Sequence, residues 1–245
     1  MRVGRVVVVG ASTVLALAWC AISGLLSGGD PMLAVEIAAS AFLIVWATYT
    51  VREVWTARTL GRRFASQSTD AIVGGVPCRV LGGMSHEAIV VGALAPIIYV
   101  GAGLLAVLDE EERRGVLLHE EYHRRTRAPL RAAALEAWLR LARRPRILER
   151  LLTERIADLE VSADAFAMAA GATPGALASA LLKGQAGPAA GASFAGASER
   201  RIGALLDAAR GTPPRRRRPP LEWLPLAFVG VAVLGCHLGI VAGLS

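Results

Sequence analysis

The chain has 245 residues, of which 54% are hydrophobic and only 5% are aromatic, and its mean hydropathy is +0.47. The length allows one or two domains, and the composition is too apolar for an ordinary soluble domain and predicts membrane segments. The net charge of +7 comes almost entirely from arginine, since Lys183 is the only lysine. Because the basic residues are not interleaved with aromatic ones, we expect no nucleic-acid partner.

Three apolar segments have about the length needed to cross a bilayer, namely residues 6–26, 32–51 and 223–244. Arginines precede the first segment, follow the second and precede the third, whereas the turn over residues 27–31 carries no positive charge. The positive-inside rule then predicts an integral protein of a bacterial-type plasma membrane, with the lipid bilayer as a partner and its central region in the cytoplasm. A cleaved signal peptide over residues 1–23 is the alternative that this pattern leaves open.

Another apolar stretch, residues 88–108, is interrupted by glycine and proline. We interpret residues 87–91 and 96–100 as short strands and residues 102–108 as the start of a helix. A fourth membrane span is the alternative interpretation of this stretch.

The acidic run from Asp109 to Glu112 opens the next predicted helix, because negative side chains are favourable at the positive end of a helix. An amphipathic segment over residues 130–142 and a helix over residues 145–170 follow. A loop rich in small residues is expected over residues 184–197, and a linker rich in proline and arginine over residues 211–220.

The most informative pattern is His119-Glu120-Glu121-Tyr122-His123, an H-E-x-x-H sequence within a predicted helix. Residues i and i+4 share one face of a helix, so both imidazoles can point at one metal ion. Glu120 would lie beside that ion, where a general base is needed in a zinc peptidase. Catalytic zinc usually takes three protein ligands and keeps one position open, so the pattern leaves one ligand to be found.

The helix after Pro145 offers carboxylates for the third ligand, and the candidates are Glu149, Glu154, Asp158, Glu160 and Asp164. Four of them form two copies of an E-x-x-A-D pattern. In each copy the acidic residues lie at i and i+4, so one can bind the metal while the other orients a histidine. The residues alone leave both copies open.

The segment from Val116 to Arg125 resembles the active-site helix of integral-membrane zinc metallopeptidases. This superfamily includes the HtpX and CAAX-prenyl-protease group and the BlaR/MecR antirepressor group. The resemblance covers about residues 75–206 and implies one zinc ion per chain. In that superfamily the third ligand is the Glu of an E-x-x-A-D motif, and the sequence that follows Asp164 favours Glu160 over Glu154.

The same resemblance implies further roles in the site. Asp164 is expected to orient His119 or His123. The segment Arg201-Ile202-Gly203-Ala204-Leu205 resembles a family segment whose arginine lies near the active site, so Arg201 is a candidate catalytic residue that stabilises an oxyanion. Ala195 occupies the place where the HtpX group often has a histidine, so no such histidine role is expected. Residues 91–100 resemble a strand pair whose edge strand can hold an extended peptide.

These features predict a mainly α fold with a small β element, in which transmembrane helices flank a compact gluzincin-like zinc metallopeptidase domain. The expected organisation is two transmembrane helices over residues 1–51, a cytoplasmic metallopeptidase domain over 52–210, a linker over 211–220 and a transmembrane helix over 221–245.

The predicted function is a membrane-embedded zinc endopeptidase that cleaves membrane or cytoplasmic proteins through water activated by Glu120. Regulated proteolysis and protein quality control both fit as its role. Two roles stay open for Tyr122: it can help to hold the oxyanion, or it can be a packing residue. The alternative function is a non-catalytic membrane scaffold or sensor stapled by zinc, but structural zinc sites usually close four ligands and no fourth is evident.

Overall fold

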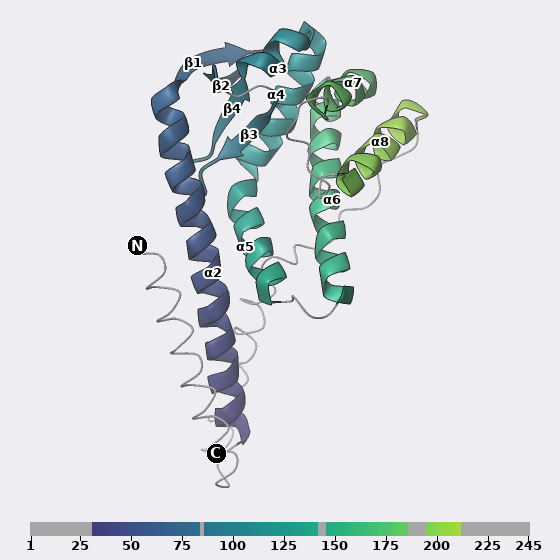
Figure 1. Ribbon diagram of the computed structural model, residues 1–245. Helices are drawn as coiled ribbons and strands as arrows, with labels where there is room; N and C mark the ends of the chain where they lie inside the picture. Colours follow the sequence, from purple (N-terminus) through teal and green to yellow (C-terminus); the bar gives the residue numbers. More distant parts are fainter. Residues whose placement is uncertain (1–30, 84–85, 142–145, 186–194, 212–245) are drawn as a thin grey trace, which may run out of the picture. The chain divides into compact units, whose positions relative to one another are not determined.

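The computed structural model describes residues 31–83, 86–141, 146–185 and 195–211 (Figure 1). Its helices are α2 (Pro31–Gln67), α3 (Ala102–Val107), α4 (Glu110–Arg125), α5 (Ala128–Leu141), α6 (Arg146–Ala169), α7 (Pro174–Gln185) and α8 (Ala195–Ala209). Its strands are β1 (Ser68–Val73), β2 (Val76–Leu81), β3 (Ala88–Val91) and β4 (Ile97–Gly101). The prediction of a mainly helical chain with a small β element is therefore confirmed.

The transmembrane part of the predicted fold class is wrong. Among the described residues, no helix is both long and apolar enough to cross a membrane. This finding overturns the predicted span over residues 32–51, and with it the integral-membrane localisation and the cytoplasmic orientation derived from the spans. The segments predicted to span at residues 6–26 and 223–244, and the signal peptide considered over 1–23, lie outside the described residues.

The apolar run at 32–51 is only part of α2, which is 37 residues long and continues past this run into a charged stretch. Within this run, Trp46 packs with Ala134 and Ala137 of α5 in a small buried cluster. The indole Nε1 of Trp46 also donates a hydrogen bond to the carbonyl oxygen of Ala134, at 3.3 Å. Apolar side chains in this helix thus pack against other parts of the protein. The hydropathy of a sequence does not show whether an apolar side chain contacts protein or lipid.

The chain divides into two compact units. One comprises residues 1–53, 133–143 and 220–245, and the other comprises residues 54–132 and 144–219. The second unit contains the sheet, α4 and all of α6, and it includes every residue of the predicted zinc site.

The four strands form one mixed sheet in the order β1-β2-β4-β3. Strands β1 and β2 are antiparallel, β2 and β4 are parallel, and β3 and β4 are antiparallel. The predicted strands over 87–91 and 96–100 are confirmed as β3 and β4, which excludes a fourth membrane span there. Strands β1 and β2 were not predicted.

A two-residue turn connects β1 to β2 and lies against α4. Both turn residues, Gly74 and Gly75, have positive φ angles, of 56° and 80°. Such a pair forms the type I′ turn that matches the twist of a hairpin. A Cβ atom on Gly74 would lie only 3.0 Å from the Cα of Arg114, so the close approach of the hairpin to α4 also requires glycine.

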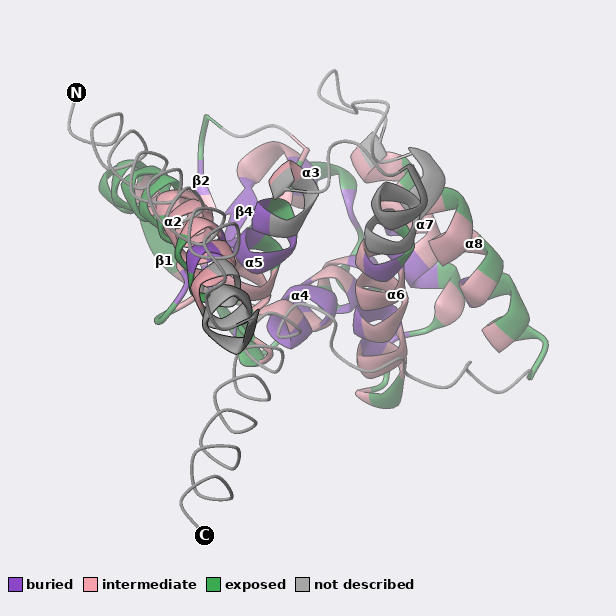
Figure 2. Ribbon diagram, turned by 90° about the horizontal axis from the view of Figure 1, so that it is seen from below, coloured by how far each residue is buried: buried purple, intermediate pink, exposed green. Residues whose placement is uncertain are grey.

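The main core lies between the sheet and α4. Ile98 and Val100 from β4 are fully buried there with Leu117 from α4. A second cluster packs α6, α7 and α8 around Leu177 and Leu205. Helix α4 is accordingly one of the most buried helices of this unit, as the burial colours of Figure 2 show.

The other predicted helices agree with the structure to within a few residues. The helix start at 102–108 corresponds to α3, the segment 130–142 to α5, and the segment 145–170 to α6. Helix α7 continues to Gln185 and α8 begins at Ala195, so both helices extend into the loop predicted over 184–197. The middle of that predicted loop, residues 186–194, lies outside the described residues.

Candidate metal centre

Helix α4 presents the H-E-x-x-H residues, and its first turn is fixed by an N-terminal capping box. The side chain of Asp109 accepts a hydrogen bond from the backbone N–H of Glu112, and Glu112 accepts one from the backbone N–H of Asp109. Each bond satisfies an amide that the helix itself leaves unpaired. The acidic residues predicted to open this helix therefore do so, and the two histidines follow on one continuous face.

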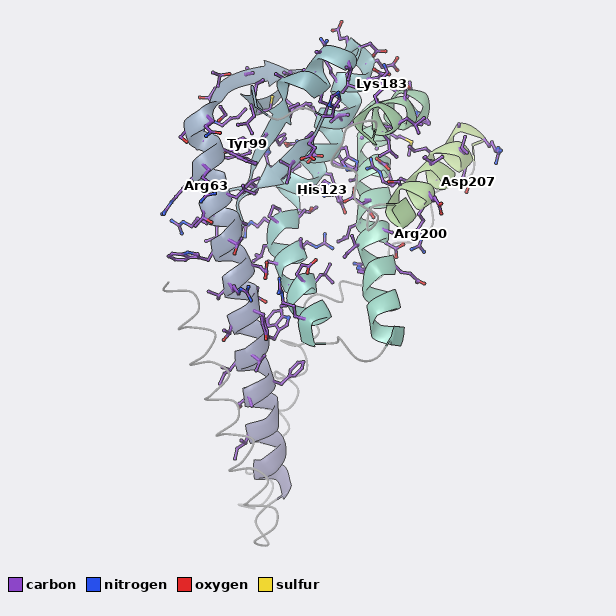
Figure 3. All side chains as sticks on the ribbon, in the orientation of Figure 1. Arg63, Tyr99, His123, Lys183, Arg200 and Asp207 are labelled. Carbon is purple, nitrogen blue, oxygen red and sulfur yellow. The ribbon has the colours of Figure 1, made fainter. Side chains whose placement is uncertain are left out.

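The side chains of His119, His123 and Glu160 converge, with one potential ligand atom from each lying within 4.8 Å of the others. The two Nε2 atoms of the histidines are 3.0 Å apart. Oxygens of Glu160 lie 3.3 Å from Nε2 of His119 and 3.4 Å from Nε2 of His123. Figure 3 labels His123, which projects from the C-terminal half of α4.

These separations fit a zinc ion. Zinc bonds of 2.0–2.2 Å to nitrogen or oxygen in a tetrahedron place neighbouring ligand atoms about 3.4 Å apart. Two imidazole nitrogens and one carboxylate are also the ligand set of a catalytic zinc site with an open fourth position. One such group of His, Cys, Asp or Glu side chains occurs among the described residues.

Asp164 fixes the orientation of His119. Its Oδ1 atom lies 2.7 Å from Nδ1 of His119, and the carboxyl group is only 1% exposed. Burial opposes ionisation, but hydrogen bonds from His119 and Arg201 lower the pKa of Asp164 below its ordinary value. An ionised carboxylate only accepts hydrogen bonds, so Nδ1 donates to Asp164, and Nε2 is the ring nitrogen left to bind a metal in place of its proton.

Glu160 is also held in its charged form. Burial raises its pKa, but hydrogen bonds from His119 and His123 outweigh this effect, and the pKa lies well below the ordinary value. In the metal-free protein, burial and the charge of Arg201 lower the pKa of His119, whereas hydrogen bonds to Asp164 and Glu160 raise it to about 9. The carboxylates thus already favour a positive charge at the place where a metal ion would bind.

Glu120 follows the first histidine of the motif on α4, and its negative charge acts on Arg201. It is 9% exposed, and its carboxylate makes no hydrogen bond or ion pair with another of the described residues. The adjacent Glu121, by contrast, is bound by Arg124 and Arg125 at 2.6–2.7 Å. Tyr122 is buried and its ring lies 5.7 Å from that of Phe166, which supports the packing role for this tyrosine.

The first E-x-x-A-D copy lies away from the metal centre. Glu154 is exposed and does not belong to the converging group. Asp158 lies 3.7 Å from Arg200, and the same guanidinium donates a hydrogen bond to the carbonyl oxygen of Glu154. Glu149 lies on α6, outside the residues whose side chains are described.

The contacts that Arg201 and Glu112 make around the site could not be predicted from the sequence. Arg201 binds Asp164 directly, and Glu112 ties α4 to α7 through Lys183 and Ser179. The partners of Glu112 are separated from it by 67 and 71 residues, so no local spacing signals these contacts.

Comparisons with models of protein families, with curated proteins and with solved structures give no match to this chain. The family resemblance of the two metal motifs therefore stays a prediction.

Proposed function

We propose that this protein is a zinc-dependent endopeptidase. The observation that carries the proposal is the convergence of His119, His123 and Glu160, whose ligand atoms are separated by 3.0–3.4 Å. The carboxylate of Glu120, the next residue after a ligand, has no hydrogen-bond partner among the described residues and adds the base that hydrolysis requires. Three ligands and a base are the composition of a catalytic centre, whereas a structural zinc site usually has four protein ligands.

In this mechanism His119, His123 and Glu160 would hold the ion, and Asp164 would fix the orientation of the His119 ring. Zinc bound here would lower the pKa of a water molecule and polarise the scissile carbonyl. Glu120 accepts a proton from the attacking water and then delivers it to the nitrogen of the leaving amine.

The position of β3 at the edge of the sheet is an argument for a peptide substrate. Strand β3 is an edge strand of the described sheet. Together with β4 it packs into the core that includes Leu117 of the active-site helix α4. The free side of an edge strand can pair with an extended peptide through main-chain hydrogen bonds. A peptide bound in this way would be recognised mainly through its backbone, which is suited to an endopeptidase.

Substitution of Glu120 by Gln tests the proposal. Gln is nearly isosteric but accepts no proton, so we expect hydrolysis of an unfolded protein substrate to fall by about 10²–10⁴-fold. Zinc content should stay at the wild-type level, because Glu120 is not a ligand. Glu110→Gln is the matched control, since this exposed carboxylate is on the same helix and its loss should leave hydrolysis unchanged.

Two results would contradict the proposal. If zinc-loaded wild-type protein does not cleave unfolded substrates, the alternative of a zinc-stapled, non-catalytic protein is favoured. If Glu120→Gln cleaves as fast as wild type, Glu120 is not the base.

A further inference from the structure

All three nitrogen atoms of the Arg201 guanidinium face carboxylates of the chain itself. Nε lies 2.8 Å from Oδ2 of Asp164, and Nη2 lies 2.8 Å from Oδ1 of the same residue. Nη1 lies 3.5 Å from Oε2 of Glu160. The side chain of Arg201 is only 15% exposed, so little of it is accessible to a bound substrate.

Asp164 depends on this contact because it is 1% exposed. A buried carboxylate is stable only when its charge is compensated and its oxygens accept hydrogen bonds. Arg201 supplies a paired contact to both oxygens, which also fixes the plane of the carboxylate. One of these oxygens is the atom that lies 2.7 Å from Nδ1 of His119.

We propose that Arg201 is a positioning residue, which holds Asp164 and Glu160 in place and through them sets the affinity of the His119–His123–Glu160 centre for zinc. This assignment replaces the expected catalytic role, in which Arg201 contacts the oxyanion of the substrate. It rests on the metal centre of the proposed function, but it does not depend on the reaction.

The neighbouring Arg200 provides a matched control. It is also on α8 and also pairs with α6, but its partners are Asp158, at 3.7 Å, and the carbonyl oxygen of Glu154. Its side chain is 35% exposed. Removal of Arg200 therefore breaks an ion pair between the same two helices without touching the carboxylates around the metal.

The test is the zinc affinity of purified full-length variants, measured by competition with a chromophoric chelator. We expect Arg201→Ala to weaken zinc binding by about 10–100-fold, as is typical when a group that orients a metal ligand is removed. Arg201→Lys should give an intermediate loss, because one ammonium keeps the charge but not the paired geometry. Arg200→Ala should bind zinc within about threefold of wild type, since a partly exposed ion pair with its charged atoms 3.7 Å apart contributes little.

A double-mutant cycle shows whether Arg201 acts through Asp164. Asp164→Asn alone should weaken zinc binding, and adding Arg201→Ala to it should cause little further loss, because the two residues act as one unit. The d–d spectrum of the cobalt-substituted protein should change in Arg201→Lys and stay unchanged in Arg200→Ala. Circular dichroism identifies any variant that fails to fold. If Arg201→Ala does not fold, the zinc affinity of Arg201→Lys is the measurement that decides.

Wild-type zinc affinity in folded Arg201→Lys and Arg201→Ala would overturn the inference, as would additive effects in the cycle. Loss of hydrolysis with unchanged zinc affinity would restore the oxyanion role and leave the proposed function intact. If wild-type protein binds zinc and Arg201 controls its affinity but no peptide is cleaved, the inference stands and the proposed function falls. Absence of zinc binding by wild type would overturn both.

Discussion

Glu112 carries a negative charge in a position that is almost shielded from water. Its side chain is 4% exposed, and both carboxylate oxygens lie 2.7 Å from Nζ of Lys183. Burial raises the pKa of Glu112, but hydrogen bonds from Lys183, Ser179 and the backbone of Asp109 outweigh burial and lower it to about 2. This carboxylate links α4 to α7, two helical turns before His119.

We expect Lys183→Met to destabilise the fold by about 1–3 kcal/mol at neutral pH, because it leaves a buried charge without its partner. Because the folded pKa of Glu112, about 2, lies below the ordinary value of 4.5, its contribution is present above pH 4.5 and is lost as the pH falls towards 2. The difference between wild type and Lys183→Met in urea unfolding should therefore shrink over this range. A difference that is the same at pH 7 and pH 2 would contradict this role, and Lys183→Arg is the control that keeps the charge.

At the level of elements, the β1–β2 hairpin and α4 approach each other closely at one glycine. Gly74 and Gly75 both need a positive φ, but only Gly74 has a backbone atom of α4 within 4 Å of where a Cβ would stand. The two positions therefore separate the strain of the turn from the packing of the hairpin on the helix.

We expect Gly75→Ala to lower the free energy of unfolding by about 1 kcal/mol, from backbone strain alone. Gly74→Ala should cost about 1–3 kcal/mol more, because the new methyl group has to push α4 or the hairpin aside. Chemical denaturation of both variants checks this. Equal losses would mean that the hairpin does not pack against α4 at Gly74.

Local patterns in the sequence predicted the elements around the site. The acidic run before the motif predicted the start of α4, and the glycine and proline breaks predicted β3 and β4. The β1–β2 hairpin has the Gly-Gly turn that signals a hairpin, but its strands are short and only partly buried, so the pattern was missed. The span at 32–51 was wrong because apolar side chains there pack in part on α5.

The candidate site was predictable only where spacing along a helix determines it. The spacing of His119 and His123 predicts a shared face, and the spacing of Glu160 and Asp164 does the same. The pairing of these two faces is a tertiary contact over 45 residues, from His119 to Asp164, and the choice of Glu160 over Glu154 needed the family resemblance. The sequence does not indicate that Arg201 pairs with Asp164 while Arg200 pairs with Asp158. By sequence alone, either arginine could pair with either aspartate.

At the scale of the whole molecule, the candidate metal ligands belong to one of two compact units. They lie in the unit formed by residues 54–132 and 144–219, which is built around the sheet and α4. The ligands come from two helices, so a bound ion would join α4 and α6 directly. Ligand binding stabilises the folded state by mass action, about 2.7 kcal/mol at a free concentration one hundred times the dissociation constant.

We expect zinc to slow hydrogen exchange of the backbone amides of α4 and α6, because opening of these helices must first release the ion. Exchange in residues 37–53, which belong to the other unit, should be little affected. His119→Ala should abolish the protection. Uniform protection of both units by zinc would indicate that the chain unfolds as one cooperative body.

The most direct measurement of the central claim is the zinc content of four purified proteins: wild type, His119→Ala, Glu160→Gln and Glu154→Gln. The structure predicts one zinc per chain in wild type and in Glu154→Gln, whose carboxylate lies outside the converging group. It predicts loss or strong weakening of zinc binding in His119→Ala and Glu160→Gln. Retention of zinc in Glu160→Gln together with its loss in Glu154→Gln would contradict this account, as would a wild-type protein that binds no zinc.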